Sequence, residues 1–293
     1  MPTPASVVNA LSVDVEDYYQ VQALSPVYKP SDWDGCESRV ERNTDLILDI
    51  LTKTGARATF FTLGWVAKRN PAMLRRIADA GHEVGSHGLC HARVDSQTPE
   101  EFRTDIRTAK AILEDISGKP VNGYRAATFS VGQKTPWAWP ILEEEGHAYS
   151  SSVYPVARDN YSNPNAPRTP YKPEGVKSLL EIPIATVRMF NRNWPSGGGG
   201  YFRLLPYQVS RAAIAHMNRQ GTPAVFYLHP WELDPDQPRV KGLSAKSRFR
   251  HYVNLSRTQD RLTRLTRAFR WERIDTAFNV AAQSAQYRHA IGG

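Results

Sequence analysis

Short apolar runs alternate with longer amphipathic stretches along most of the chain. The runs are rich in β-branched and aromatic residues, the composition that is typical of buried strands. Strands are therefore expected over residues 9–16, 57–65, 82–88, 123–130, 148–155, 179–190 and 224–231, with a weaker candidate over 271–278.

The stretches between these runs have the apolar spacing of helices. Helices are expected over residues 39–55, 70–82, 98–118, 135–147 and 205–221. Asn70 and Thr98 each precede a proline, which suits an N-cap followed by proline at the first helical position, and Gly55 suits a C-cap. Strand-then-helix units repeated about seven times favour a parallel sheet that closes into a barrel over an open sheet.

We expect residues 1–293 to form a single domain, because no linker or break in composition divides the chain. Two segments depart from the regular pattern. An irregular insertion at about residues 155–205 is rich in proline, asparagine, glycine and aromatic residues, and such insertions often shape binding sites. The last part of the chain is interpreted as a helical C-terminal extension.

The chain has 37 basic and 29 acidic residues, a formal charge of +8, with much of the excess near the C-terminus. We interpret this mainly as a solvated face, although it would also suit an anionic polymer or a membrane surface. Nucleic-acid binding would rest on charge alone and is not expected. Two cysteines are too few for a disulfide framework. Without a signal-peptide pattern or a membrane-spanning window, the sequence predicts a cytoplasmic protein, with peripheral contact to the inner membrane as an alternative.

Ionisable residues recur where predicted strands end, and in parallel α/β folds functional groups gather at that edge. They are Asp14, Glu16 and Asp17 after the first strand, His87 and His91 after the third, Arg125 in the fourth and His229 after the seventh. Two imidazoles and a carboxylate suit an open site for a divalent cation. A further acid and a separate histidine would serve proton transfer, so the set suits hydrolysis. His82, His147, His216, His251 and His289 lack partners in this pattern.

Five segments in order resemble the motifs of the polysaccharide deacetylase family, the NodB-homology or carbohydrate esterase family 4 enzymes. They are SVDVED, SHGLCH, GYRAATFS, YSSSVYP and YLHPWE, and the resemblance extends from about residue 9 to 275. GGGGYFRLLPY and FRHYVNLSRT further resemble the subgroup found with exopolysaccharide and exosortase (PEP-CTERM) loci. The resemblance implies a distorted (β/α)7 barrel of the NodB-homology type. It also implies a metal-dependent enzyme that removes N-acetyl groups from a bacterial polysaccharide or its precursor.

The resemblance also implies a role for each matching residue. Asp14 matches the catalytic base, Arg125 the arginine that orients and charge-pairs it, and His229 the acid that protonates the departing amine. His87 and His91 match metal ligands. The third ligand is expected to be Glu16, with Asp17 as a rival, because Val15 separates Asp14 from the next acid. Zinc is the expected metal, while cobalt, nickel and iron are also compatible with these ligands.

Two departures from the family pattern stand out. Ala127 replaces the proline of the third motif, and the fourth motif offers only Ser150 to Ser152 where an aspartate is usual. Either a serine hydroxyl with water substitutes, or His229 depends on Asp234 or Glu232, or activity is reduced.

Trp194, Tyr201 and Trp231 are the expected sugar contacts, with Phe202 near the barrel mouth. The glycines at 197–200 either let their loop approach the substrate and move, or form only a flexible turn.

Three functions therefore remain open, with N-deacetylation of a polysaccharide as the leading one. The second is a catalytically weak or inactive carbohydrate-binding relative, and the third is a hydrolase of O-acetyl esters or other C–N bonds. The sequence leaves the glycan and the oligomeric state undetermined.

Overall fold

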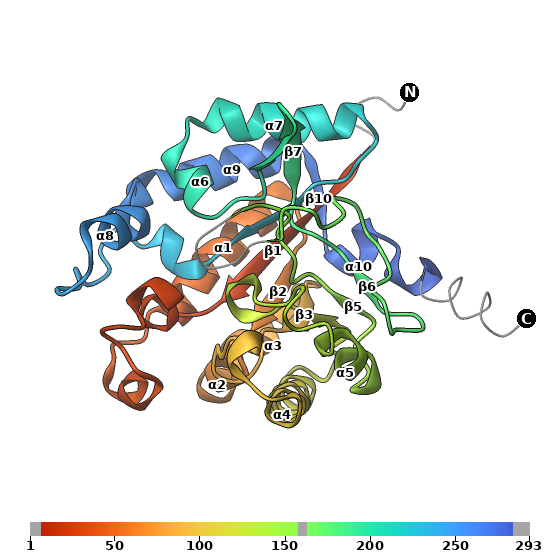
Figure 1. Ribbon diagram of the computed structural model, residues 1–293. Helices are drawn as coiled ribbons and strands as arrows, with labels where there is room; N and C mark the ends of the chain where they lie inside the picture. Colours follow the sequence, from red (N-terminus) through yellow and green to blue (C-terminus); the bar gives the residue numbers. More distant parts are fainter. Residues whose placement is uncertain (1–6, 158–162, 284–293) are drawn as a thin grey trace, which may run out of the picture.

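The computed structural model, which describes residues 7–157 and 163–283, contains one sheet of eight parallel strands (Figure 1). The strands are β1 Val8–Val15, β2 Thr59–Thr62, β3 Glu83–Ser86, β4 Gly123–Tyr124, β5 Tyr149–Ser150, β6 Leu180–Glu181, β9 Val225–Leu228 and β10 Arg270–Glu272. Their order is β10-β1-β2-β3-β4-β5-β6, and β9 also pairs with β1. Strands from the two ends of the chain therefore meet at β1.

Strand β1 is buried along seven of its eight residues, and its polar residues Asn9, Ser12 and Asp14 are each hydrogen-bonded inside the fold. It has three partners, since Val8 is in register with Arg270, and Ser12 with both Thr59 and Tyr227. On the far side of the sheet, the chain after β6 turns back towards β9. Ala185 N donates to Val225 O there. The sheet therefore curls round through irregular contacts, as expected for a distorted barrel.

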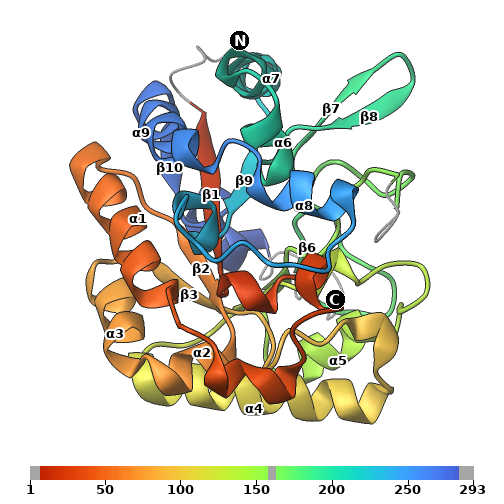
Figure 2. The same cartoon turned by 90° about the vertical axis from the view of Figure 1, so that its left-hand side faces the viewer.

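Ten α-helices of the described ranges surround this sheet (Figures 1 and 2). They are α1 Val40–Thr54, α2 Gly64–Arg69, α3 Pro71–Asp79, α4 Pro99–Ser117, α5 Ala138–Glu144, α6 Gly200–Leu204, α7 Tyr207–Arg219, α8 Ala245–Tyr252, α9 Thr258–Ala268 and α10 Ile274–Ala277. The predicted caps are present at Thr98, which forms a capping box with Glu101, and at Gly55, which has a φ of 68°. Across residues 7–157 and 163–283, each helix is too short or too polar to span a membrane.

The strand predicted over 179–190 is wrong as one element. Pro183, which has no N–H to donate, separates β6 from β7 Thr186–Met189. Strand β7 forms an antiparallel hairpin with β8 Arg192–Pro195, outside the parallel sheet. The predicted strand over 271–278 is also shorter, because β10 ends at Glu272 and α10 follows. Strand β10 returns to β1, so the C-terminal helical region also contributes a strand to the sheet.

The glycine run at 197–200 packs closely against β9. A Cβ atom at Gly198 would lie 2.0 Å from the carbonyl oxygen of Tyr227, and one at Gly197 would lie 2.2 Å from the Ile184 side chain. Gly198 also has a φ of 111°, which side chains rarely adopt. These glycines therefore allow close contact between the loop and β9.

Replacing Gly198 with alanine should destabilise the fold by about 3 kcal/mol or more, because the new methyl group overlaps backbone that cannot easily move. Urea denaturation measures the change. Gly35→Ala is the matched control, since no neighbouring atom lies within 4 Å of its added Cβ. Equal stabilities for the two variants would contradict the close-contact interpretation.

His82 predicts a pH dependence of stability. Its ring is buried and Nδ1 accepts a hydrogen bond from Ala58 N at 3.3 Å. Burial, with Arg57 and Arg273 nearby, lowers the pKa of His82 to about 4. The native state therefore favours neutral His82. The contribution of this residue to the free energy of unfolding is fully present above about pH 6.5 and is lost as the pH falls towards 4.

Between about pH 6.5 and 4, the unfolding free energy of the wild type should fall more steeply with decreasing pH than that of His82→Phe. The difference between the two slopes should be about 1.4 kcal/mol per pH unit. Unfolding free energies measured by urea at several pH values test this. Parallel profiles for the two proteins would show that His82 does not titrate as described.

Candidate active site

Six predicted residues meet at the carboxyl edge of the sheet. Asp14 and Glu16 lie at the end of β1, His87 and His91 follow β3, Arg125 follows β4 and His229 follows β9. Four strands that are distant in the sequence therefore contribute to one site.

Glu16, His87 and His91 form a buried group that could hold a metal ion. Their candidate ligand atoms all lie within 4.8 Å of one another. The Nδ1–H of His87 donates to the carbonyl oxygen of Arg125 at 2.8 Å, which leaves Nε2 with a lone pair. His91 Nε2 lies 3.0 Å from Glu16 Oε2, and that oxygen has no hydrogen-bond donor. Two imidazoles and a carboxylate oxygen without a hydrogen-bond donor fit a divalent cation.

Asp17, the rival ligand, is engaged elsewhere. Its carboxylate accepts hydrogen bonds from the backbone N–H groups of Tyr18, Arg39 and Val40 and from the Ser38 hydroxyl, at 2.6–3.1 Å. These bonds join the end of β1 to the start of α1. The geometry therefore favours Glu16 over Asp17 as the third ligand.

Arg125 is completely buried, and hydrogen-bond acceptors surround its guanidinium group. Nη1 donates to Asp14 Oδ1 and to the Ser12 hydroxyl, both at 2.7 Å. Nε and Nη2 donate to the carbonyl and hydroxyl oxygens of Ser151, at 2.9 and 2.8 Å. Burial would raise the pKa of Asp14, but the charges of Arg125, His87 and His229, with the hydrogen bond from Arg125, together outweigh burial and lower that pKa below its usual value. Asp14 is thereby kept ionised.

Two serines of the fourth motif accept hydrogen bonds from Arg125 and from the residue after it. Ser151 holds Arg125 directly, and the Ser152 hydroxyl accepts from Ala126 N at 2.9 Å. Ser130 Oγ donates to the Ala127 carbonyl at 2.7 Å and accepts from Val94 N. The loop that contains Ala127 is therefore held by side-chain hydrogen bonds despite the lost proline.

His229 is oriented by Glu232. Its Nδ1 lies 2.7 Å from Glu232 Oε1, while Nε2 faces Glu16 Oε1 at 3.4 Å and Asp14 Oδ2 at 3.9 Å. Burial would lower the pKa of His229, but Glu232, Glu16 and Asp14 raise it to about 9. Of the two predicted partners, Glu232 makes the contact, whereas Asp234 pairs with Arg39 and Arg42.

Arg203 completes this arrangement, and the sequence analysis did not predict it. It lies in α6 and is 2% exposed, and its Nε donates to Glu232 Oε2 at 2.6 Å. Its Nη atoms donate to carbonyl oxygens of Arg250, His251 and Val253 at the end of α8. Burial opposes ionisation, but Arg203 and His229 lower the pKa of Glu232 to about 2. Arg203 lies within the GGGGYFRLLPY segment noted in the sequence, but no spacing rule links it to the histidine motif.

Trp231 supports the site from below His229. Its ring stacks with His229 and His251, at centroid distances of 5.2 and 4.4 Å, and Nε1 donates to Glu16 Oε1 at 3.4 Å. Only 4% of Trp231 is exposed, which leaves little surface for the predicted sugar contact.

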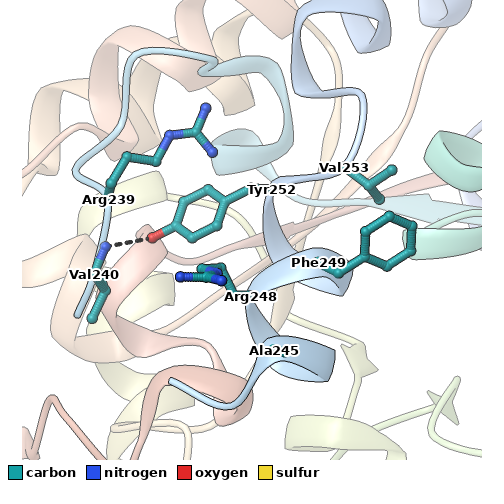
Figure 3. A pocket seen from close by; sticks show the side chains of 7 residues that line it. All are labelled: Arg239, Val240, Ala245, Arg248, Phe249, Tyr252 and Val253. Atoms are coloured by element: carbon teal, nitrogen blue, oxygen red, sulfur yellow. Dashed lines mark hydrogen bonds between the residues drawn. The ribbon is translucent and has the colours of Figure 1, made fainter. Parts of the chain in front are cut away.

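A pocket of about 440 Å³ lies beyond this stack, around α8 (Figure 3). It is lined by Arg239, Val240, Ala245, Arg248, Phe249, Tyr252 and Val253. The Tyr252 ring, which contacts His251 edge to face, lies between the pocket and the stacked rings of the site.

The other predicted aromatic contacts occupy different places. Trp194 lies on β8 and is half-exposed, with Nε1 donating to Met189 O in its own hairpin. Tyr201 is partly buried in the first turn of α6. Phe202 belongs to the core, where it packs edge to face with Phe226, so its expected position at the mouth is wrong. His82, His147 and His251 are buried outside the ligand group, His216 lies on α7, and His289 is outside the described residues.

Two family models match the chain. Residues 33–147 match polysaccharide deacetylase, and residues 151–279 match a domain of unknown function, DUF3473. A peptidoglycan-N-acetylglucosamine deacetylase of Bacillus cereus is 30% identical over 107 residues, 33% of this chain and 50% of the relative. A chitooligosaccharide deacetylase of Bradyrhizobium sp. is 25% identical over 108 residues, 37% of this chain and 47% of the relative. The chain thus spans half or less of these curated relatives, and the matches support the polysaccharide deacetylase (NodB, carbohydrate esterase family 4) family.

Solved structures show the same fold. A Mycobacterium smegmatis protein of the polysaccharide deacetylase type superposes with a TM-score of 0.65 at 20% identity, over 98% of this chain and 93% of that one. The peptidoglycan deacetylase PdaC of Bacillus subtilis gives 0.50 at 16% identity, over 99% of each chain. The predicted (β/α)7-type barrel is confirmed, and at these identities the likeness concerns the fold alone.

Zinc binding separates Glu16 from Asp17. Glu16→Gln should weaken zinc affinity by more than about a hundredfold, because it removes a charged ligand. Asp17→Asn should keep zinc binding but lower stability by about 1–3 kcal/mol, because a buried acceptor loses its charge. Calorimetric titration and urea denaturation measure both. The reverse pattern, with zinc lost only in Asp17→Asn, would reject Glu16 as the ligand.

Proposed function

We propose that this chain, whose residues 33–147 match the polysaccharide deacetylase family, is a metal-dependent hydrolase that removes N-acetyl groups from a bacterial polysaccharide or its precursor. The observation that carries the proposal is the shared site of Asp14, His229 and the candidate ligand group. His229 Nε2 lies within 3.9 Å of Asp14 Oδ2 and 3.4 Å of Glu16 Oε1. A base, an acid and a cation site therefore face the same small volume.

Each group has a role in amide hydrolysis. A divalent cation bound at this site would act as a Lewis acid and polarise an oxygen of the substrate or of water. Zinc is the cation that we propose. Asp14, kept ionised by Arg125, takes a proton from the attacking water. The water oxygen bonds to the acyl carbon, and the C–N bond then breaks. His229 gives a proton from Nε2 to the departing nitrogen, so that acetate and a free amine are released.

The environment of His229 supports an amide substrate. An amine leaves poorly unless its nitrogen is protonated, and Glu232 favours the protonated imidazole that this step requires. Loss of an alcohol from an O-acetyl ester depends less on such an acid. The intact hydrogen bonding of Arg125 likewise supports catalysis over carbohydrate binding alone.

Narrower parts of the proposal rest on the sequence. The segments at 197–207 and 249–258 suggest exopolysaccharide biosynthesis, and both lie in the region that matches the domain of unknown function. Action on a precursor before export would fit the cytoplasmic location expected from the sequence. We also treat the chain as one domain, a view supported by Arg125 in the first matched region, which donates hydrogen bonds to Ser151 in the second. Tyr201 remains a candidate sugar contact.

Acetate release tests the function. Protein stripped of metal and reloaded with zinc should release acetate from N-acetylglucosamine oligomers or peptidoglycan, and Asp14→Asn should slow turnover by about a hundredfold or more because the base is lost. Asp34→Asn is the control, since this exposed carboxylate pairs with Arg69 away from the site. If zinc binds while neither substrate nor the host polysaccharide releases acetate, the proposal fails.

A further inference from the structure

The β7–β8 hairpin carries an exposed apolar tip. Figure 2 shows the hairpin extending away from the rest of the fold. Phe190 at the turn is 91% exposed, and Met189 and Trp194 beside it are 47% and 49% exposed. Phe190 is the most exposed large apolar side chain in the described part of the chain. Apolar clusters of this kind on a surface usually mark a contact with a partner or a membrane.

The backbone conformation of the turn does not favour phenylalanine at position 190. Phe190 and Asn191 have φ values of 49° and 58°, the pair of left-handed conformations required by a tight hairpin turn. Asparagine tolerates this conformation, but a bulky aromatic residue is unfavourable in it. Phe190 therefore weakens its own turn while exposing its ring to water, so it is best explained by a contact outside the chain.

The base of the hairpin is firmly attached, so the tip is presented in a defined position. Val187 is buried, and Asn193 Nδ2 donates to the carbonyl oxygens of Pro155 and Pro164 at 2.9 and 3.1 Å. At the other end, Arg168 donates to the hydroxyl and carbonyl oxygens of Thr186. The projection is therefore a built element of the fold.

The charged residues of the segment that contains the hairpin are all basic. No aspartate or glutamate occurs between Glu181 and Glu232, whereas the same segment contains five arginines. Four of them are exposed, namely Arg188 and Arg192 in the hairpin region and Arg211 and Arg219 on α7. Helix α7 lies beside the base of the hairpin in both views (Figures 1 and 2). The exposed apolar tip thus projects from a segment whose exposed charged residues are arginines.

We infer that the β7–β8 hairpin docks on an anionic lipid bilayer, with Phe190, Met189 and Trp194 in the headgroup region. Aromatic residues favour that region, and nearby arginines are attracted to anionic lipids. The tip is convex, so it cannot enclose a rigid ligand such as a sugar, but it can enter a deformable layer. A second copy of the chain would bring the same positive surface and be repelled.

Vesicle co-sedimentation tests this inference. The wild-type protein should bind vesicles of phosphatidylglycerol and phosphatidylcholine and bind poorly to phosphatidylcholine alone, with binding reduced by salt. Phe190→Asn should lower the partition coefficient about tenfold or more, because the ring no longer enters the bilayer. Asparagine suits the turn, so the same variant should unfold at an equal or higher urea concentration. A purely structural Phe190 would give the opposite stability result.

Two further variants complete the design. Arg188→Glu with Arg192→Glu should abolish the preference for anionic vesicles. Leu46→Asn is the control, because this exposed apolar residue lies on α1 between the acidic side chains Asp45 and Asp49, and its vesicle binding should equal that of the wild type. The inference is overturned if anionic vesicles do not bind, if Phe190→Asn binds like the wild type, or if the tip variants affect binding to an acidic polysaccharide only. Because vesicle binding requires no turnover, its outcome is independent of the proposed hydrolysis.

Discussion

The buried guanidinium of Arg125 is the interaction on which the site depends. A charge without solvent contact must have its N–H groups paired, and removing one partner of such a pair costs about 3–5 kcal/mol. Arg125 therefore requires Asp14 and Ser12 from β1 and Ser151 after β5 to lie at fixed positions around it. Its carbonyl also orients His87, so one residue fixes both the candidate base and a candidate ligand.

Arg203 is a second buried arginine, and it has a corresponding role for His229. Arg203 holds Glu232, and Glu232 holds His229. The two arrangements have opposite consequences for protonation. Arg125 keeps the Asp14 carboxylate ionised, whereas the carboxylate of Glu232 favours the protonated imidazole of His229. The base and the acid can therefore lie close together with different protonation states.

Much of this site could be predicted from the sequence because strand ends in a parallel sheet converge at one edge. Asp14, His87, His91, Arg125 and His229 needed only that rule and the motif order. The choice between Glu16 and Asp17 needed the actual course of the chain, since β1 ends at Val15 and Asp17 turns towards the start of α1.

Other features depend on contacts that leave no periodic pattern. Arg203 acts across sequence-distant elements, and the glycines at 197–199 are explained only by their close contacts with Ile184 and Tyr227. The hairpin was hidden inside an apolar run that resembled one strand, because the interruption consists of a single proline at position 183.

The position of β1 between β9 and its other partners also has a consequence for how the chain folds. Val8 pairs with Arg270, so contacts that complete the sheet join residues almost a whole chain length apart. Contacts of such long sequence separation form slowly, because closing the intervening loop costs entropy before any contact compensates for it. During synthesis β1 cannot pair with β9 and β10 until those strands have left the ribosome. That edge of β1 stays unpaired until then. Chaperone dependence and aggregation of truncated chains are the expected costs of this topology.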